Sequence, residues 1–393
     1  MGRTELYRTF AACMAAFLHE TSYALPPLTA AQWGKLYNLA KRQSLSGALF
    51  AAVSDNDMPD TVRDRLRRDG FLMLTKYEAQ KEACRAIEDA LSSKDIAHVF
   101  VKGAVIRRYY PDPALRSMGD IDVVIHEHDR LRADRAMQDL GFAVTEQLGD
   151  VWVYERDGYL VEVHTVLRRF DVTTQTPVEY TTLWTDARHL RGSSYRLSNE
   201  AEAAYVISHL ASHFAAGGCG LRQLMDVAVL YRRFPDEALW HGVFAKLAPD
   251  GTARFAQHLL WLCARWFSLD IPDTLTAPVD EQAETHMLYR LLADGTFGTD
   301  ERLLIAQKRK EQRLQKQGGE LGRVWRHAFP DADTVRRRYP YAKHTWLLPV
   351  AYGHRLLDAA TKHRTAHKRR AAYAKDRADE IAQELALFDA MDL

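Results

Sequence analysis

The stretch MGDIDVVI at residues 118–125 places two carboxylates at the start of an apolar, β-branched run. Such a run predicts a β-strand, in which successive side chains alternate between the two faces. Asp120 and Asp122 therefore share one face and lie close enough to share a cation. Carboxylates this close repel one another unless a cation, typically Mg²⁺, lies between them.

A third carboxylate stands in a second strand-like run, YLVEVH at residues 159–164. Glu162 is flanked there by apolar residues, as is typical of a carboxylate on the polar side of a half-buried strand. Three acids on two neighbouring strands suit one or two Mg²⁺ ions that clamp a triphosphate. The alternative is that the Asp-x-Asp pair is solvated surface or a helix cap, because such pairs are common in sequences.

Residues upstream of the acid pair favour a phosphate site over that alternative. The apolar run HVFV at residues 98–101 is followed by Lys102 and Gly103, and then by a short helical run at 104–110. Glycine permits the tight turn and the close backbone approach that phosphate oxygens need. A helix that starts there points free backbone N–H groups at an anion. Arg116, just before the acid pair, is placed to reach a phosphate.

These motifs, in this order, resemble the bacterial "uncharacterised nucleotidyltransferase" family of the DNA polymerase beta-like nucleotidyltransferase superfamily. The pattern of that family is matched by Lys102-Gly103, Tyr110-Pro111, Arg116, Asp120-Ile121-Asp122 and Glu162-Val163-His164. A later helical part of the family carries His-x-x-x-His followed by an Arg…Asp helix, which is matched by His209, His213, Arg222 and Asp226. A weaker likeness continues at Arg338-Tyr339-Pro340 and at residues 346–350.

One position departs from the wider superfamily. The glycine turn usually reads Gly-Ser or Gly-Gly there, whereas this chain reads Gly103-Ala104. The serine hydroxyl that often touches a phosphate is therefore missing. Lys102 is a candidate substitute, because an ammonium group acts as a point charge toward phosphate.

The resemblance implies an α+β fold, with a small mixed-sheet nucleotidyltransferase core between helical regions. We place the helical N-terminal region at residues 1–93, the core at 94–197 and the helical C-terminal region at 198–393. Hydrophobic spacing predicts strands at 99–101, 121–125, 142–145, 151–154 and 160–163. It predicts the clearest helices at 61–92 (interrupted at Gly70), 129–140, 200–214, 221–234, 253–267 and 357–387.

The predicted activity is metal-dependent transfer of a nucleoside monophosphate from an NTP to an acceptor. The phosphates are expected at Lys102 and Gly103, with Arg116 as a helper. Mg²⁺, or alternatively Mn²⁺, is expected on Asp120 and Asp122, while Glu162 completes a second metal site or acts as the base for the acceptor hydroxyl. Two other classes stay open. One is sugar transfer from a nucleotide-sugar to a phosphorylated peptide or small molecule at the same metal site, and the other is a noncatalytic or toxin-like regulatory protein with this fold.

The acceptor is expected to be a small molecule, a peptide or RNA, in a groove that faces the three acids. His164, two residues beyond Glu162, is placed to approach the metal, to act as a base or to hold a ligand by a hydrogen bond. His209 and His213 share a helix face at a spacing that can hold a metal, although polar residues that line an interdomain groove are the commoner case. Arg222 and Asp226 follow on the next helix and complete the predicted acceptor groove.

The composition is that of an ordinary globular protein. Among the 393 residues, 47% are hydrophobic and 27% are charged, which is enough apolar material for a sizeable core. The four cysteines are isolated, without a Cys-x-x-Cys motif, which predicts reduced thiols and a cytoplasmic protein. The apolar run at 11–18 is short and lacks a cleavage signature, so no signal peptide is expected. No uncharged run is long enough to span a bilayer.

Charge is distributed unevenly along the chain. Residues 302–377 contain 20 Lys and Arg against 6 Asp and Glu, although the whole chain carries a net charge of +1. A basic face attracts an anionic partner such as nucleic acid, anionic lipid or a phosphorylated protein. The other interpretation is a set of solvated helix faces, and it is slightly favoured because aromatic residues are not interleaved with the basic blocks as a stacking platform requires.

Overall fold

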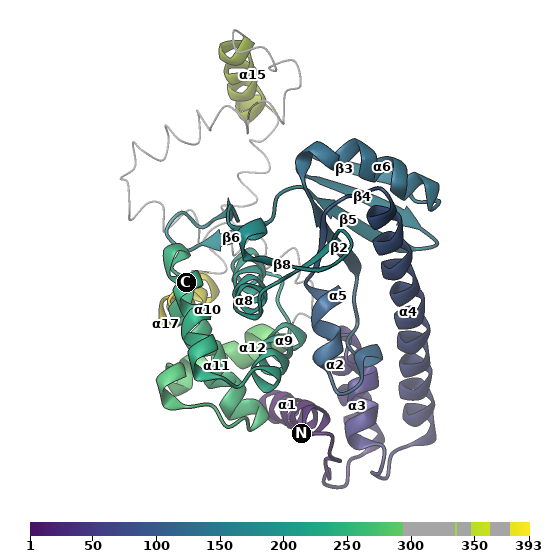
Figure 1. Ribbon diagram of the computed structural model, residues 1–393. Helices are drawn as coiled ribbons and strands as arrows, with labels where there is room; N and C mark the ends of the chain where they lie inside the picture. Colours follow the sequence, from purple (N-terminus) through teal and green to yellow (C-terminus); the bar gives the residue numbers. More distant parts are fainter. Residues whose placement is uncertain (294–334, 336–346, 362–377) are drawn as a thin grey trace. The chain divides into compact units, whose positions relative to one another are not determined.

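The computed structural model describes residues 1–293, 335, 347–361 and 378–393 (Figure 1). The chain forms two compact units, of which the first comprises Met1–Gly298 with Asp389–Leu393 and the second comprises Thr299–Phe388. The sheet and every predicted site residue belong to the first unit. The second unit contains α15 (Leu348–Thr361) and most of α17 (Ala378–Ala390).

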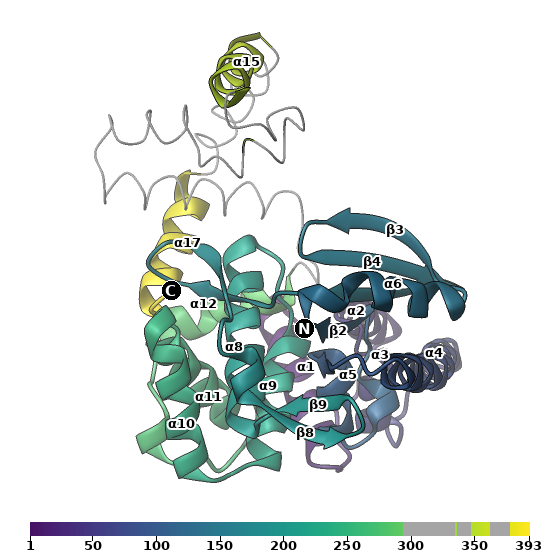
Figure 2. The same cartoon turned by 45° about the horizontal axis from the view of Figure 1, so that its top comes forward.

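Seven strands of the described residues form one mixed sheet, in the order β3-β4-β5-β2-β1-β9-β8. Figure 2 shows β3 and β4 on one side of β2, and β9 and β8 on the other. Their bounds are β1 His98–Val101, β2 Asp120–Ile125, β3 Ala143–Leu148, β4 Val151–Arg156, β5 Tyr159–His164, β8 Ala187–Arg191 and β9 Ser194–Leu197. Strand β2 pairs antiparallel with β1 and parallel with β5. A separate hairpin is formed by β6 (Arg168–Asp171) and β7 (Thr176–Glu179). The predicted α+β fold with a mixed sheet is confirmed.

Helices precede, interrupt and follow the sheet along the chain. Those before it are α1 (Arg3–Leu18), α2 (Ala30–Arg42), α3 (Ser46–Val53) and α4 (Asp60–Ser93). Those between its strands are α5 (Gly103–Ile106), α6 (Arg130–Asp139) and α7 (Leu183–Asp186). Those after it are α8 (Asn199–Ala216), α9 (Leu221–Arg233), α10 (Glu237–Leu247), α11 (Ala253–Phe267) and α12 (Glu281–Leu292).

The two faces of the sheet have different roles. In β2, the odd-numbered residues from Ile121 to Ile125 are fully buried and pack with α4 and α6. Val124 points to the opposite face, where it packs with residues of α7 and α8. Because side chains alternate along a strand, Asp120 and Asp122 share this second face. The apolar alternation of β2 thereby directs both carboxylates toward α8.

Local signals in the sequence position α8 and α9 beside the acids. The Ser198 hydroxyl accepts a hydrogen bond from the Ala201 N–H at 3.2 Å and caps the start of α8, as serine does at helix N-termini. The helix ends at Gly217, whose φ of +100° lies in the left-handed region that glycine adopts without steric cost. Helix α9 begins four residues later, so the two helices are joined by a short turn.

Helix α4 is longer than its sequence pattern predicts, because Gly70 does not interrupt it. A Cβ atom on Gly47 of α3 would lie 3.6 Å from the Gly70 Cα atom. The glycines therefore lie where α3 and α4 approach closely, and this packing gain offsets the low helix propensity of glycine.

Parts of the C-terminal predictions fall outside the described residues. Helix α15 ends at Thr361 and α17 begins at Ala378, so the middle of the helix predicted at 357–387 is among the residues not described. The basic blocks at 308–310, 336–338 and 368–370 lie outside the described residues as well. The three-region division of the chain stays a prediction. Among the described residues, no helix is both long and apolar enough to cross a membrane.

Candidate active site

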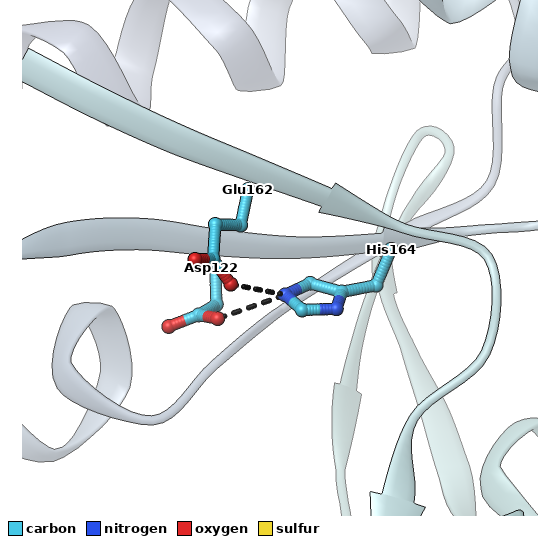
Figure 3. Close-up of side chains that lie close together, drawn as sticks. All are labelled: Asp122, Glu162 and His164. Atoms are coloured by element: carbon cyan, nitrogen blue, oxygen red, sulfur yellow. Dashed lines mark hydrogen bonds and ion pairs between the residues drawn. The ribbon is translucent and has the colours of Figure 1, made fainter. Parts of the chain in front are cut away.

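The parallel pairing of β2 with β5 brings three metal-ligating side chains together. Asp122 is opposite Glu162, and Val124 is opposite His164. The His164 Nε2 atom lies 2.9 Å from Asp122 Oδ1 and 3.3 Å from Glu162 Oε2 (Figure 3). One ligand atom from each of the three residues lies within 4.8 Å of the other two. This donor set of two carboxylates and an imidazole can hold a divalent cation.

Lys102 places a positive charge next to the Asp122 carboxylate. It follows β1, whose last residue Val101 is opposite Asp122, and its Nζ atom lies 2.5 Å from Asp122 Oδ1. Its φ of +54° is unusual for a residue other than glycine and costs backbone strain, which is often found at functional sites. The ammonium group and the His164 imidazole therefore share one oxygen atom of Asp122.

The two aspartates of β2 differ in their electrostatic environment. Burial opposes ionisation of Asp122, but the Lys102 ammonium and His164 outweigh it and hold the pKa of that carboxyl well below its usual value. The pKa of Asp120 is raised instead, by burial and then by the charge of Asp122. Asp122 is thus a stable anion, whereas Asp120 would gain from a further positive charge nearby.

Gly103 is packed where no side chain fits. A Cβ atom at this position would lie 2.5 Å from Arg116 Nη1 and 2.8 Å from the Met118 side chain. The glycine therefore leaves room for the Arg116 and Met118 side chains against the turn after β1. This close approach is a structural reason for glycine that is independent of any phosphate.

Replacing Gly103 by Ala should destabilise the protein by about 1–3 kcal/mol, the usual range for overpacking, and should displace Arg116. The measurement is urea unfolding of the variant against the wild type. Gly119→Ala is the matched control, since a Cβ atom there meets nothing within 4 Å. Equal stability of the two variants would show that the Gly103 turn relaxes freely.

Arg116 is engaged with α9. Its Nη2 and Nε atoms donate to the two carboxylate oxygens of Asp226 at 2.7 and 3.1 Å. The Tyr110 hydroxyl donates to Asp226 Oδ1 at 2.7 Å. Arg116 and Asp226 are both buried, at 6% and 4% exposure. The phosphate contact predicted for Arg116 stays a prediction, and in this structure its guanidinium joins the loop before β2 to α9.

Arg222 adds a second link between α9 and the same loop. Its Nη1 atom donates to the backbone carbonyl of Ser117 and, at 3.1 Å, to the Ser117 hydroxyl. Burial, followed by the nearby Arg116 charge, lowers the pKa of Arg222 to about 10. Asp226 and Arg222 are thus both committed to holding the segment that carries the acid pair.

The two histidines of α8 face each other across one helical turn. The Nε2 atoms of His209 and His213 lie 2.9 Å apart, so one of them donates and the other accepts. Burial, followed by the charge of Lys102, lowers the pKa of both imidazoles. Two neutral imidazoles are therefore favoured on the α8 side of the site.

A cavity of about 320 Å³ brings most of the predicted site residues together. It is lined by Lys102, Gly103, Arg116, Asp120, Asp122, Glu162, His209, His213, Arg222 and Asp226. Its apolar wall consists of Ile106, Met118, Val206 and Leu210, and Gly119 and Gln223 complete the lining. His164 is not part of this lining and is buried against the two carboxylates.

The predicted site residues do not include the apolar wall of the cavity, although the sequence carries a signal for Val206 and Leu210. Val206 and Leu210 stand on α8 at the helical spacing of His209 and His213, so all four occupy one helix face. A mixed face of two apolar residues and two histidines is typical of a pocket lining.

A second cavity, of about 710 Å³, is larger but contains none of these residues. Its lining comes from α1, α11 and α12 and from the segments next to α1 and α11, and it includes Arg8, Trp266 and Glu284. The Glu284 carboxylate there already accepts from Arg265 and from the Trp266 indole. Chemistry, not volume, therefore favours the smaller cavity as the active site.

A comparison with protein families places the chain among the nucleotidyltransferases. A family model described as "Uncharacterised nucleotidyltransferase" matches residues 29–268, which is well over half of the chain and includes every predicted site residue. The chain belongs to this family, and the predicted family and enzyme class are confirmed. No curated protein matches the chain.

Two solved structures are similar to parts of the chain. One is the solution structure of the antibiotic-resistance factor ANT(2'')-Ia, with 14% identity and a TM-score of 0.34, which covers 44% of this chain and 94% of that one. The other is the crystal structure of ANT(2'')-Ia in complex with adenylyl-2''-tobramycin, with 13% identity and a TM-score of 0.34, which covers 44% and 98%.

Proposed function

We propose that this nucleotidyltransferase moves a nucleoside monophosphate from an NTP to an acceptor hydroxyl with the help of a divalent cation. The observation that carries the proposal is one cavity lined by Asp120 and Asp122, by Glu162 and by the turn at Lys102 and Gly103. Phosphoryl transfer needs little more than positioning and charge stabilisation. This cavity places acidic side chains, which can hold a cation, next to the turn at Lys102 and Gly103, which can position phosphates.

The donor set fits a divalent cation. Asp120 and Asp122 supply oxygen ligands from one strand, and Glu162 supplies another from the neighbouring strand. Burial, followed by the charge of Asp122, raises the pKa of Asp120, and a nearby cation would favour its ionised form. When bound, the cation would neutralise charge on the phosphates and orient them.

The residues around the acids divide the work. Lys102 contributes a positive charge toward the phosphates from the turn after β1. The acceptor oxygen attacks the α-phosphorus, the bond from that phosphorus to the bridging oxygen breaks, and pyrophosphate leaves. Glu162 acts on the acceptor side, where it would take the hydroxyl proton as a base or would help to hold a second cation.

The acceptor is proposed to enter from the α8 and α9 side. His209 and His213 supply neutral donors and acceptors of hydrogen bonds there, and Val206 and Leu210 supply an apolar wall. A cavity of about 320 Å³ is at the lower end of the range for small-molecule sites. This size favours a compact acceptor group, either a small molecule or the exposed end of a larger one.

The testing experiment pairs a ligand screen with product analysis. The protein is screened by thermal shift against NTPs and nucleotide-sugars with Mg²⁺ or Mn²⁺, and active mixtures are analysed by mass spectrometry. Nucleotidyl transfer adds a nucleoside monophosphate to the product and releases pyrophosphate. Addition of a sugar with release of a nucleoside diphosphate would replace the proposal by sugar transfer, and binding without any product in a wide acceptor panel would favour a regulatory protein.

Replacing Glu162 by Gln should slow turnover by about 10²–10³-fold, in line with loss of a group that acts in proton transfer. The nucleotide affinity should change little, because Glu162 stands on a different strand from the acid pair. Single-turnover rates and nucleotide titration measure the two effects separately. A collapse of nucleotide affinity with normal turnover at saturation would assign Glu162 to the donor side instead.

A further inference from the structure

The backbone of the sheet places the His164 imidazole beside two of the acids. It is buried, at 7% exposure, and its Nε2 atom points between the carboxylates of Asp122 and Glu162 (Figure 3). The register of β2 and β5 fixes this arrangement, since Glu162 and His164 are two residues apart on one strand. The nitrogen therefore belongs to the same face as the acids.

Two of the three distances between these atoms are those of neighbouring ligands on one cation. Nε2 lies 2.9 Å from Asp122 Oδ1 and 3.3 Å from Glu162 Oε2. An octahedral cation with bonds of about 2.1 Å places neighbouring ligand atoms roughly 3 Å apart. Small side-chain movements would bring all three atoms onto one cation.

We propose that Asp122, Glu162 and His164 bind the acceptor-side cation, with the His164 Nε2 atom as a direct ligand, and that the site therefore prefers first-row transition metals, with Mn²⁺ as the paramagnetic probe, to Mg²⁺. Mg²⁺ takes oxygen ligands, whereas an imidazole nitrogen favours transition metals. The inference rests on the proposed function, because it identifies the second cation position of the same active site. Asp120 then remains for the cation that arrives with the nucleotide.

Lys102 accounts for the charge balance before the cation binds. Its ammonium group lies at Asp122 Oδ1, the oxygen that also contacts His164. A divalent cation at this position would take the place of the ammonium group, and Lys102 could then turn toward the phosphates. The nucleotide-free protein thus offers the side chains of Asp122, Glu162 and His164 at one position. Cation binding at this position can therefore be measured without the cation that arrives with the nucleotide.

The test is Mn²⁺ binding to the full-length, nucleotide-free protein at constant pH. Free Mn²⁺ is followed by electron paramagnetic resonance, Mg²⁺ is added as a competitor, and electron spin echo modulation detects a directly coordinated ¹⁴N nucleus. The wild type should bind Mn²⁺ at least about tenfold more tightly than Mg²⁺ and should show the nitrogen signal. His164→Gln should lose the signal and weaken Mn²⁺ binding about 10–100-fold, with a smaller effect on Mg²⁺.

Matched variants separate the outcomes. His126→Gln removes an imidazole just beyond the far end of β2 and should bind Mn²⁺ like the wild type. His164→Asp replaces nitrogen by oxygen and should shift the preference toward Mg²⁺. Bound Mn²⁺ without a nitrogen signal in the wild type would mean that His164 only hydrogen-bonds the carboxylates, which overturns this inference and leaves the metal site standing. Unchanged Mn²⁺ binding in Asp122→Asn would place the cation elsewhere and remove the proposed function as well.

Discussion

Asp122→Asn is expected to lower the rate of nucleotidyl transfer by about a thousandfold or more, since several kcal/mol of charge stabilisation are lost with a metal ligand. The effect should exceed that of any other single substitution in the site. Asp122 is the side chain that contacts Lys102 and His164 together and is proposed to bind the acceptor-side cation. Initial rates at saturating nucleotide, measured by product mass spectrometry, give the result.

Asp122→Asn should also lower the free energy of unfolding. The same substitution of an acid that faces solvent in a cleft would change that energy little. Asp122 is only 2% exposed, and Asn would leave the Lys102 side chain, which is 17% exposed, without its ion-pair partner. Breaking a buried ion pair from one side costs about 3–5 kcal/mol, and the partial exposure of Lys102 favours the lower end. Urea unfolding measures this cost, and the double variant Lys102→Met with Asp122→Asn should recover part of it.

Activity and stability together decide the role of Asp122. A variant that folds at the temperature of the assay and transfers nucleotide at the wild-type rate would remove Asp122 from the active site. Asp120→Asn is the informative comparison, because Asp120 is not paired with Lys102. It should lose activity with little change in stability.

The acid pair and Glu162 could be predicted from sequence because the signals are local. The alternation of apolar and acidic residues within β2 and within β5 predicts which side chains share a face. The parallel register of these strands is not written in either segment, yet it is what places His164 next to Asp122. The sequence alone therefore leaves several roles open for His164.

Strand β8 is absent from the predicted strands for a different physical reason. Strand β8 lies at the edge of the sheet, and most of its residues, which read ARHLR, are exposed. An edge strand without a buried face lacks the apolar alternation from which strands are predicted. Charged residues on such an edge also discourage pairing with other chains.

The ion-pair partner of Arg116 could not be predicted from the sequence. A basic residue just before an acid pair predicts a phosphate contact, because the sequence shows only which residues lie near it along the chain. Its partner Asp226 lies 110 positions further along the chain. Only the packing of α9 against the loop before β2 brings them together, and the pair then competes with phosphate for the guanidinium group.

Asp226→Ala is expected to destabilise the protein by about 3–5 kcal/mol, because a buried arginine loses its carboxylate partner. The Tyr110 hydroxyl loses its acceptor as well. The free energy of unfolding in urea measures the effect. A double variant, Arg116→Met with Asp226→Leu, should recover much of the stability, since apolar residues of similar volume replace a buried ion pair at little cost.

The same substitutions separate a structural role of Asp226 from the acceptor contact that the sequence predicts. If Asp226 holds the loop, the double variant should recover stability and much of the transfer rate, because Asp120 and Asp122 return to their places. If Asp226 binds the acceptor, stability returns but transfer to the acceptor stays low, while nucleotide binding is normal. The buried bidentate contact with Arg116 favours the first result, since a carboxylate whose two oxygens are already engaged has little left to offer an acceptor.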